Sequence, residues 1–346
     1  MKAVDMKDEL ESNASSVSEY ILSSLEGDPI ELYRASSHYI ISGGKRLRPF
    51  ILIKSNEMFG GNPKMAMPAA AAVELIHNFS LVHDDIMDND EMRHSVKTVH
   101  KSYGMPLAIL AGDILFSKAF ELLTVHGRAG GIPDKAICEM VSRLSSACIQ
   151  VCEGQATDVR MASVENKCSI ESPQYFNMIS KKTAALFELS CTLGVLSAPD
   201  SSKGDVENLS SFGRNIGIAF QLVDDLIGIT GDPNLTGKAV GNDLREGKRT
   251  YPIHLALKNA SDENKRNILK VFGKKHASTS DLKEAVSTVS KIGIDKEIRM
   301  AARTHIEKAV QSLADYEDSR PKRTLESSAF FIVERSLYVI VFALVC

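Results

Sequence analysis

The chain has 346 residues, 44% of them hydrophobic, and a formal net charge of −3. This length and apolar content allow a substantial core, arranged as one large domain or two ordinary ones. A charge balance so near neutral gives no reason to expect nucleic acid or an anionic membrane as a partner.

Cysteine usage and the two ends of the chain predict a cytoplasmic protein. The six cysteines form no paired CxxC pattern, which favours reduced thiols. Residues 1–16 are acidic and polar, unlike a signal or transit peptide. The apolar tail, residues 336–346, is too short to span a bilayer. We expect it to be a packing or interface segment, without stable membrane insertion.

Apolar residues at helical spacing predict helices along the chain. We expect them at residues 5–25, 30–42, 50–60, 66–103, 107–126, 135–163, 173–198 and 205–229, with several more after residue 253. The sequence contains no convincing series of alternating strand positions and no repeat of fixed period. It therefore predicts an all-α protein.

The motif GGKRLRP, residues 43–49, separates the second and third expected helices. Alone, it could be a basic surface loop. Alternatively it is an anion clamp, in which two glycines allow close backbone approach and three basic side chains donate charged hydrogen bonds to phosphate: Lys45, Arg46 and Arg48.

Residues 69–103 contain neither Gly nor Pro and predict one long helix. Asp84 and Asp88 are four residues apart on it and point the same way. His77 lies about 20° from Asp84 on the helical wheel. With Asp85 beside them, these acids repel one another unless a cation is bound. Such hard oxygen ligands suit Mg²⁺, although an isolated motif could be a solvated helix end.

A second acidic segment, FQLVDD at residues 220–225, echoes the FSLVHDD that precedes Asp88. Gln221 and Asp224 share one stripe of its helix with small residues. The two Asp pairs stand roughly 140 residues apart on apolar helices. Together they predict two acidic walls that face each other across one cleft.

Basic residues accompany both acidic segments. They are Arg93 and His94 after the first, Lys182 with Thr183 in KKTAALFE, and Lys238 and Lys248 in the irregular loop at 231–252. Each could belong to a charge-balanced surface. If they are functional they would bind phosphate, and a loop of this length and composition is often a lid.

The pattern as a whole describes a magnesium-bridged diphosphate site. The sequence has no GxxxxGK[ST] loop, no GxGxxG after a strand and no visible nucleophile–base triad, so nucleotide binding and acyl transfer are not expected. What remains is chemistry in which diphosphate leaves or is hydrolysed, stabilised by cations in a dry helical cleft.

Five motifs in chain order, GGKRLRP, FSLVHDDIMD, KTAALF, FQLVDDL and GKAVGNDLREGKRTYP, closely resemble the trans-prenyl diphosphate synthases (polyprenyl synthetases). The archaeal geranylgeranyl diphosphate synthases look nearest, and the resemblance runs from about residue 20 to 335. It implies a single domain over residues 1–346, an isoprenoid synthase-type bundle of antiparallel helices around a central cleft, and a cytoplasmic homodimer.

The resemblance also implies an activity. It is the Mg²⁺-dependent head-to-tail (1′-4) condensation of isopentenyl diphosphate with dimethylallyl, geranyl or farnesyl diphosphate, for isoprenoid or ether-lipid biosynthesis. The expected product is all-trans geranylgeranyl diphosphate. Phe79 and Ser80 would form the floor of the pocket that limits chain length, although Phe79 could instead be a core residue.

Roles for individual residues follow from the same resemblance. Three Mg²⁺ ions, replaceable by Mn²⁺, would be bound by Asp84, Asp88 and Asp224, with Asp85 and Asp225 supporting them. Isopentenyl diphosphate would be held by Lys45, Arg48 and His77, with His94 at a further contact position. The allylic diphosphate would be held by Arg93, Lys182, Thr183, Gln221, Lys238 and Lys248; Lys182 and Lys238 join the aspartates in the catalytic set.

The sequence departs from the family pattern in places. His94 replaces a second arginine, so binding of isopentenyl diphosphate would be weaker and pH-sensitive. Ser95 and Lys97 replace a Gly and a Pro of the following loop, and Gly228 stands where many members have a third Asp. The apolar tail has no clear counterpart. No primary metal ligand is lost, so we expect an active enzyme.

Other readings stay open beside this one. The product could be farnesyl or a longer-chain prenyl diphosphate. A class I terpene cyclase is disfavoured because the chain has no Trp and only 6% aromatic residues. A metal phosphohydrolase using His83 would need further His ligands. A non-catalytic regulatory subunit of a prenyl synthase is disfavoured by the intact aspartates.

Overall fold

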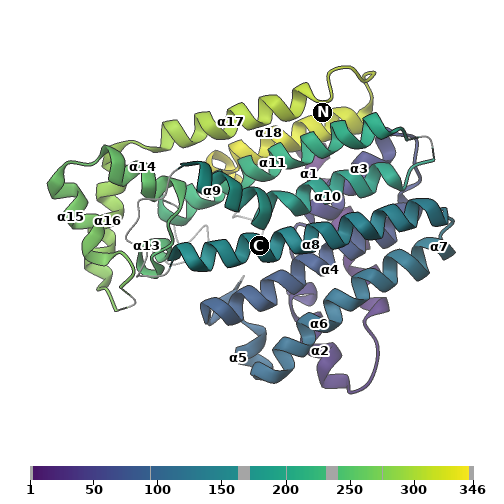
Figure 1. Cartoon of the computed structure of the whole chain (residues 1–346), viewed down its shortest axis with the longest axis horizontal. Coiled ribbons are helices and arrows are strands. Elements are labelled where there is room, and N and C mark those ends of the chain that lie inside the picture. Colours follow the sequence, from purple (N-terminus) through teal and green to yellow (C-terminus); the bar gives the residue numbers. More distant parts are fainter. Residues whose placement is uncertain are drawn as a thin grey trace. The chain divides into compact units, whose positions relative to one another are not determined.

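The computed structural model describes residues 3–93, 95–162, 172–199, 201–230, 241–274 and 276–342. Within these ranges the elements are helices (Figure 1), apart from one antiparallel hairpin of β1 (Met92–Arg93) and β2 (Val96–Lys97). The all-α prediction is confirmed.

The chain folds into two compact units. Unit 1 comprises Met1–Ile149, Leu186–Gly213 and Ser312–Ser327, and unit 2 comprises Gln150–Ala185, Arg214–Gln311 and Ser328–Cys346. The single domain expected over residues 1–346 stays a prediction.

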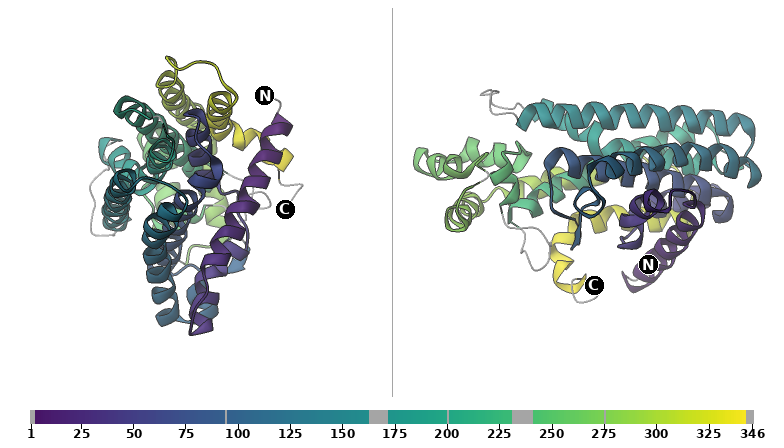
Figure 2. Two further views of the ribbon diagram at one scale, coloured as in Figure 1. Left: turned by 90° about the vertical axis from the view of Figure 1, so that its right-hand side faces the viewer. Right: turned by 90° about the horizontal axis from the view of Figure 1, so that it is seen from below.

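Unit 1 is organised around one buried helix. Its helices are α1 (Ala3–Ser24), α2 (Ile30–Ile41), α3 (Leu47–Met58), α4 (Pro63–Asp88), α5 (Val99–Tyr103), α6 (Met105–Glu121), the π-helical turn η1 (Leu122–His126) and α7 (Gly127–Ala129). Parts of α8 (Asp134–Ala162), α10 (Ala185–Leu196), α11 (Lys203–Thr230) and α18 (Arg320–Phe342) complete it. Helix α4 packs against α3 and lies beside α6 (Figure 2).

Helix α4 is a core helix. It begins at Pro63, a favourable first position, and the Asn62 side chain accepts a hydrogen bond from the Lys64 N–H at 3.0 Å. By length and composition it is the one helix among the described residues that could cross a membrane, yet 67% of its apolar window is buried inside the protein. Its apolar character therefore serves the packing of unit 1.

The predicted single helix over residues 66–103 is wrong at its C-terminal end. Helix α4 ends at Asp88, and Asn89 takes a left-handed conformation with φ of 55°. The β1–β2 hairpin and α5 follow, and Ser95 is also left-handed, with φ of 65°. Asn tolerates positive φ better than most residues, so the chain turns here without the glycine or proline that would have revealed a break.

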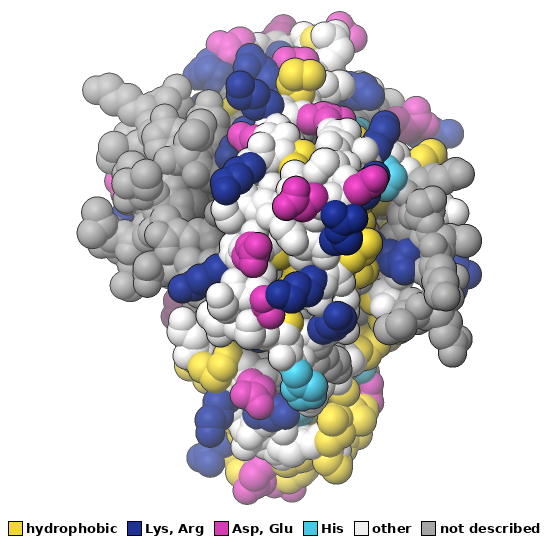
Figure 3. Space-filling model, turned by 90° about the vertical axis from the view of Figure 1, so that its left-hand side faces the viewer, with side chains coloured by type: hydrophobic (Ala, Val, Ile, Leu, Met, Phe, Trp, Pro, Cys, Tyr) yellow, Lys and Arg dark blue, Asp and Glu magenta, His cyan; other side chains and the backbone are white. Residues whose placement is uncertain are grey.

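Unit 2 contains the second acidic segment. Its elements are α9 (Ser172–Ile179), the π-helical turn η2 (Ser180–Ala184), α13 (Asn242–Glu246), α14 (Tyr251–Asn259), α15 (Asp262–Val271), α16 (Thr279–Ile292), α17 (Asp295–Gln311) and the remaining parts of α8, α11 and α18. Helix α14 packs against α9, α16 and α17. The face that carries α15 and α16 shows interspersed charges of both signs (Figure 3).

Two sequence predictions fall outside this description. Residues 231–240 of the expected lid lie outside the described residues, and the remainder of that loop includes the short helix α13. The tail, residues 336–346, is described as backbone only as far as Phe342 in α18, so its packing role stays a prediction.

Candidate active site

The GGKRLRP loop joins α2 to α3 in unit 1. Gly43 and Gly44 have φ of 98° and 136°, conformations that glycine alone adopts readily. Lys45 is exposed beyond them, and the guanidinium of Arg48 lies 4.5 Å from the ring centre of buried Phe187. A cation over an aromatic face is held by electrostatic attraction. Phe187 therefore orients Arg48, a role that its place in the KTAALF motif could have suggested.

Arg46, expected as a third phosphate donor, points inward instead. Its guanidinium is buried and donates to Glu74 at 2.9 Å, to the Ile40 carbonyl at 2.8 Å and to the Ser18 hydroxyl at 3.1 Å. Burial raises the pKa of Glu74, while the charge of Arg46 opposes that rise. The prediction for Arg46 is wrong, because a buried carboxylate on α4 requires the charge. Arg46 anchors the loop.

The adjacent aspartates of α4 lie in different environments. Asp85 is 1% exposed and accepts a hydrogen bond from the Tyr39 hydroxyl. It also accepts a hydrogen bond from Arg93 Nε at 2.7 Å and forms an ion pair with Arg93 Nη2 at 2.6 Å. The side chain of Asp84 is 21% exposed and lies 3.8 Å from Arg93 Nη2. Asp88 is half-buried one turn further on. Asp85, the second acid of the adjacent pair, therefore makes its hydrogen bonds inside the protein.

The hairpin after α4 carries Arg93. It is tied to the end of α4 by hydrogen bonds from the Asp90 N–H to the Asp85 carbonyl at 3.0 Å and from the Thr98 hydroxyl to the Asp90 carbonyl at 2.8 Å. His94, expected to contact isopentenyl diphosphate, lies outside the described residues. The hairpin therefore fixes Arg93 next to the acidic end of α4.

Replacing Ser95 with Gly is expected to raise the free energy of unfolding by about 1 kcal/mol. Ser95 has φ of 65°, a conformation that costs an L-residue about 1–2 kcal/mol, partly offset by the greater freedom of unfolded glycine. Urea denaturation measures the change. The control is Ser102→Gly in α5, where glycine should destabilise. Destabilisation of both variants would contradict the expectation.

The residues assigned to chain length lie on α4 together with His77. His77 is half-buried, and its carbonyl accepts a hydrogen bond from the Ser80 hydroxyl at 2.7 Å. The Phe79 ring lies 5.3 Å from Phe116 on α6, which lies 5.1 Å from Phe120. Phe79 thus begins an aromatic row that includes two rings the sequence reasoning did not single out.

In unit 2, the second acidic pair repeats the arrangement of the first. Asp224 is half-buried, whereas Asp225 is 7% exposed and accepts hydrogen bonds from the Tyr175 hydroxyl and from Gln221 Nε2, both at 2.6 Å. Gln221 Oε1 in turn accepts from the Thr183 hydroxyl at 2.6 Å. The two polar residues expected at the allylic diphosphate therefore form one chain of hydrogen bonds with the buried acid.

Burial raises the pKa of Asp225 from its ordinary value of 3.8 to about 7, and the charge of Asp243 acts in the same direction. Hydrogen bonds from Tyr175 and Gln221 oppose the shift. Because the pKa is higher in the folded than in the unfolded protein, the carboxyl's contribution to stability is complete below about pH 4 and is lost as the pH rises through about 7.

Asp225→Asn is accordingly expected to gain stability relative to the unsubstituted protein as the pH rises from about 4 to 8. In the absence of divalent cations the gain should amount to roughly 1–3 kcal/mol, below the ceiling of 1.36 kcal/mol per pKa unit. Urea denaturation in EDTA at several pH values measures it. A difference between the two proteins that does not vary with pH would refute the expectation.

The π-helical turn η2 presents Lys182 and Thr183. Lys182 Nζ pairs with Asp158 at 2.6 Å, and Lys181 Nζ pairs with Glu153 at 2.7 Å, both on α8. A Cβ on Gly154 would lie 2.3 Å from the Lys182 backbone nitrogen. Such π-turns occur often at functional sites. Sequence reasoning gave Asp158 no role, because its partner Lys182 is 24 residues away in sequence and no local pattern connects the two.

Gly228 has a structural explanation. A Cβ at this position would lie 2.8 Å from Oδ2 of Asp243 on α13. The carboxylate of Asp243 thus occupies space that a side chain at position 228 would need. Where many family members have a third Asp on this helix, here an Asp from α13 lies beside the glycine. Lys248 lies nearby in sequence and pairs with Glu246 at 2.9 Å. Lys238 lies outside the described residues.

The donor set fits a magnesium ion shared with phosphate. Among the described residues no three His, Cys, Asp or Glu side chains gather into a closed metal site. Mg²⁺ is commonly held by one or two carboxylates together with substrate phosphates and water. Three partly exposed carboxylates suit such a role: Asp84 and Asp88 in unit 1, and Asp224 in unit 2. The buried acids Asp85 and Asp225 suit it less, because their oxygens already accept hydrogen bonds from other side chains.

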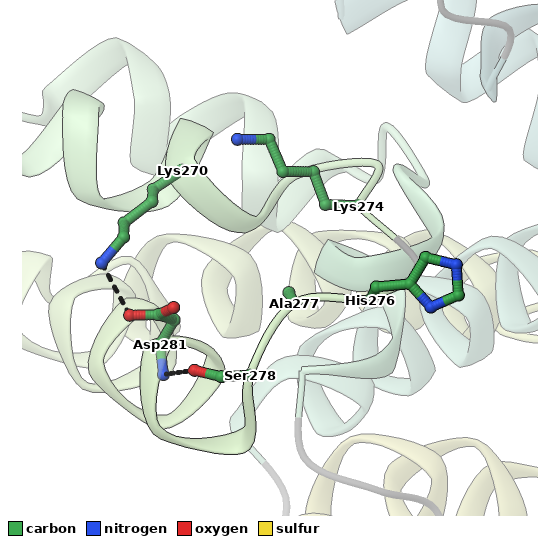
Figure 4. Close-up of a pocket in the computed structure, with 6 residues that line it drawn as sticks. All are labelled: Lys270, Lys274, His276, Ala277, Ser278 and Asp281. Atoms are coloured by element: carbon green, nitrogen blue, oxygen red, sulfur yellow. Dashed lines mark hydrogen bonds and ion pairs between the residues drawn. The ribbon is translucent and has the colours of Figure 1, made fainter.

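A hollow elsewhere on unit 2 contains none of the predicted site residues (Figure 4). It is lined by Lys270, Lys274, His276, Ala277, Ser278 and Asp281. Lys270 and Asp281 neutralise each other at 2.6 Å, and Ser278 caps α16.

Comparison with known proteins gives consistent results. Residues 30–289 match the sequence profile of the polyprenyl synthetase family. A geranylgeranyl diphosphate synthase of Sulfolobus acidocaldarius is 42% identical over 93% of this chain and 96% of its own length. The crystal structure of geranylgeranyl pyrophosphate synthetase from Pyrococcus horikoshii superposes with a TM-score of 0.87 at 40% identity, covering 97% of this chain and all of that one.

A polyprenyl synthase from Caulobacter crescentus, crystallised with calcium and isoprenyl diphosphate, has a TM-score of 0.85 and 29% identity, covering 95% of this chain and 98% of its own. The similarity thus extends over nearly the whole chain and includes the ordered motifs described above. This chain belongs to the polyprenyl synthetase family.

Proposed function

We propose that this chain is a prenyltransferase that condenses isopentenyl diphosphate head-to-tail with allylic diphosphates, and that its product is geranylgeranyl diphosphate. Family membership supports the reaction type, and the names of the Sulfolobus and Pyrococcus relatives support the product. The observation that carries the proposal is the repeated acidic pair. In each pair one aspartate is buried and hydrogen-bonded inside the protein, and its neighbour is partly exposed.

The reaction begins when the allylic C–O bond breaks and its electron pair leaves with diphosphate. The double bond of isopentenyl diphosphate then attacks the allylic cation, a C–C bond forms, and a proton is lost to the departed diphosphate. Arg93, Lys182 and Thr183 would hold the allylic diphosphate, and Lys45 and Arg48 the isopentenyl diphosphate. Bound Mg²⁺ would neutralise the charge that develops on the leaving group.

We also propose a homodimer in the cytoplasm. Its support is a series of exposed apolar residues on α6 and η1: Met105, Ile109, Leu110 and Val125. Exposed apolar side chains of this kind favour burial against another copy of the chain. Light scattering coupled to size exclusion tests the dimer, and a monomer at micromolar concentration would exclude it.

The direct test is incubation of the purified chain with labelled isopentenyl diphosphate, each short allylic diphosphate and Mg²⁺, followed by product sizing. A twenty-carbon product supports the proposal, whereas fifteen- or twenty-five-carbon products would replace geranylgeranyl by another chain length. A hydrocarbon formed without isopentenyl diphosphate would indicate a cyclase. No turnover with any allylic substrate would favour a non-catalytic subunit.

Phe79→Ala is expected to lengthen the product. Phe79 begins the aromatic row with Phe116 and Phe120, and removal of its ring would open space beside α4 for further five-carbon units. Chromatographic sizing of the dephosphorylated product measures the change. Tyr20→Ala, which removes a ring that contacts His126 instead, serves as control. An unchanged product from Phe79→Ala would reject the pocket-floor role.

A further inference from the structure

The two acidic pairs share a feature that neither motif encodes. In unit 1 the hydroxyl of Tyr39 on α2 donates to Asp85, and in unit 2 the hydroxyl of Tyr175 on α9 donates to Asp225 at 2.6 Å. Each tyrosine comes from a different helix and is distant in sequence from its acid. In each case the acid is the second residue of its pair.

Both contacts are buried. Tyr39 and Tyr175 are 3% and 1% exposed, and their acids are 1% and 7% exposed. A carboxylate removed from water needs hydrogen-bond donors, and leaving one oxygen without a donor is costly. Each hydroxyl therefore holds one carboxylate oxygen in a fixed place.

The second oxygen of each carboxylate holds a residue expected at the substrate. Asp85 Oδ1 accepts a hydrogen bond from Arg93 Nε and forms an ion pair with Arg93 Nη2. Asp225 Oδ1 accepts a hydrogen bond from Gln221 Nε2, and Gln221 Oε1 accepts one from the Thr183 hydroxyl. The tyrosine is thus the inner end of a short chain of hydrogen bonds that leads to residues expected at the allylic diphosphate. Tyr39 is itself fixed by the Val99 N–H, which donates to its oxygen at 3.3 Å.

Helix geometry gives the arrangement a second effect. Neighbouring residues on a helix point about 100° apart. When the second aspartate is drawn inward by its tyrosine, the first is turned away from that direction. Asp84 and Asp224 are the partly exposed members of their pairs, as this geometry requires.

We propose that Tyr39 and Tyr175 are matched positioning residues, each of which holds the second aspartate of a pair so that this carboxylate orients the donors for the allylic diphosphate. The inference rests on the proposed function and extends it to two residues outside the five motifs. It predicts that loss of either hydroxyl weakens binding of the diphosphate more than it changes the turnover of bound substrate.

The chain offers a matched control. Tyr316 also donates its hydroxyl to an aspartate, Asp205 at 2.7 Å, and accepts from Asn208 at 3.0 Å. Neither partner belongs to an acidic pair. Tyr39→Phe, Tyr175→Phe and Tyr316→Phe therefore remove the same kind of hydrogen bond, two at the proposed site and one elsewhere.

The experiment measures the affinity of each variant for inorganic diphosphate with Mg²⁺ by calorimetry, and KM and kcat for the allylic substrate. Tyr39→Phe and Tyr175→Phe should raise the Kd and the KM by about tenfold, the size of effect that outer-shell partners have on a bound site, with a smaller change in kcat. Tyr316→Phe should change neither. Equal Kd values for all three variants would overturn the proposal.

A double-mutant cycle covers the case in which a variant folds poorly. If Tyr39 acts through the carboxylate of Asp85, adding Tyr39→Phe to Asp85→Asn should cause no further loss of diphosphate affinity, and the buried charge is absent from both proteins. Additive losses would overturn the proposal. Absence of prenyl product from the unsubstituted protein would count against the proposed function, whereas the calorimetric comparison addresses the tyrosines separately.

Discussion

Asp84→Asn is expected to lower kcat by about 10²–10³-fold, the loss typical when one preorganised group that stabilises developing charge is removed. Asp84 is the partly exposed member of its pair, with a side chain 21% exposed, so its carboxylate is available to a cation that the leaving diphosphate shares. The amide keeps the shape but loses the charge. Steady-state kinetics at saturating Mg²⁺ and substrates measure the effect.

Stability distinguishes loss of chemistry from loss of fold. Because the Asp84 side chain is partly exposed and its ion pair with Arg93 is long, at 3.8 Å, the free energy of unfolding should change by less than about 1 kcal/mol. Asp134→Asn is the control: it removes a carboxylate that pairs with Arg128 at the surface of unit 1, where both side chains are 69% exposed. Such a pair contributes little. If both variants keep full activity, Asp84 is not a metal ligand.

Gly154→Ala is expected to lower the free energy of unfolding by about 1–3 kcal/mol and to raise the KM for the allylic diphosphate. The added Cβ would lie 2.3 Å from the nitrogen and 2.7 Å from the Cα of Lys182. Both atoms are backbone, so α8 and η2 must move apart, and overpacking of this kind costs more than alanine gains in helix propensity. The shift would displace Lys182 and Thr183.

Gly204→Ala tests the same exchange where space exists. Gly204 lies in the first turn of α11, and the nearest atom to an added Cβ is Ser202 Oγ at 3.7 Å. Alanine should be neutral or stabilising there. Urea denaturation and substrate kinetics on both variants check the pair. A Gly154→Ala protein as stable and active as Gly204→Ala would show that η2 tolerates displacement.

Sequence reasoning predicted the helical class and the two acidic pairs, because apolar periodicity and short motifs are local signals. It also named Arg93, Gln221 and Thr183, which join the hydrogen bonds of the buried acids, but not the two tyrosines. It placed Asp84 and Asp88 on one face of a helix, and they lie one turn apart at the C-terminal end of α4. It failed at the end of that helix, since Asn89 and Ser95 adopt left-handed conformations that their residue types permit but do not require. Arg46 was misassigned because its partner, Glu74, is far away in sequence.

The sequence by itself determined the all-α class, the family and the acids, bases and glycines from which a diphosphate site can be built. Only the tertiary structure decided which acid of each pair is buried, that Phe187 orients Arg48, and that Asp243 fills the space beside Gly228. The physical reason is that burial and hydrogen bonding depend on partners brought together by packing. A carboxylate's role follows from the donors around it, and those donors come from helices that no local pattern connects.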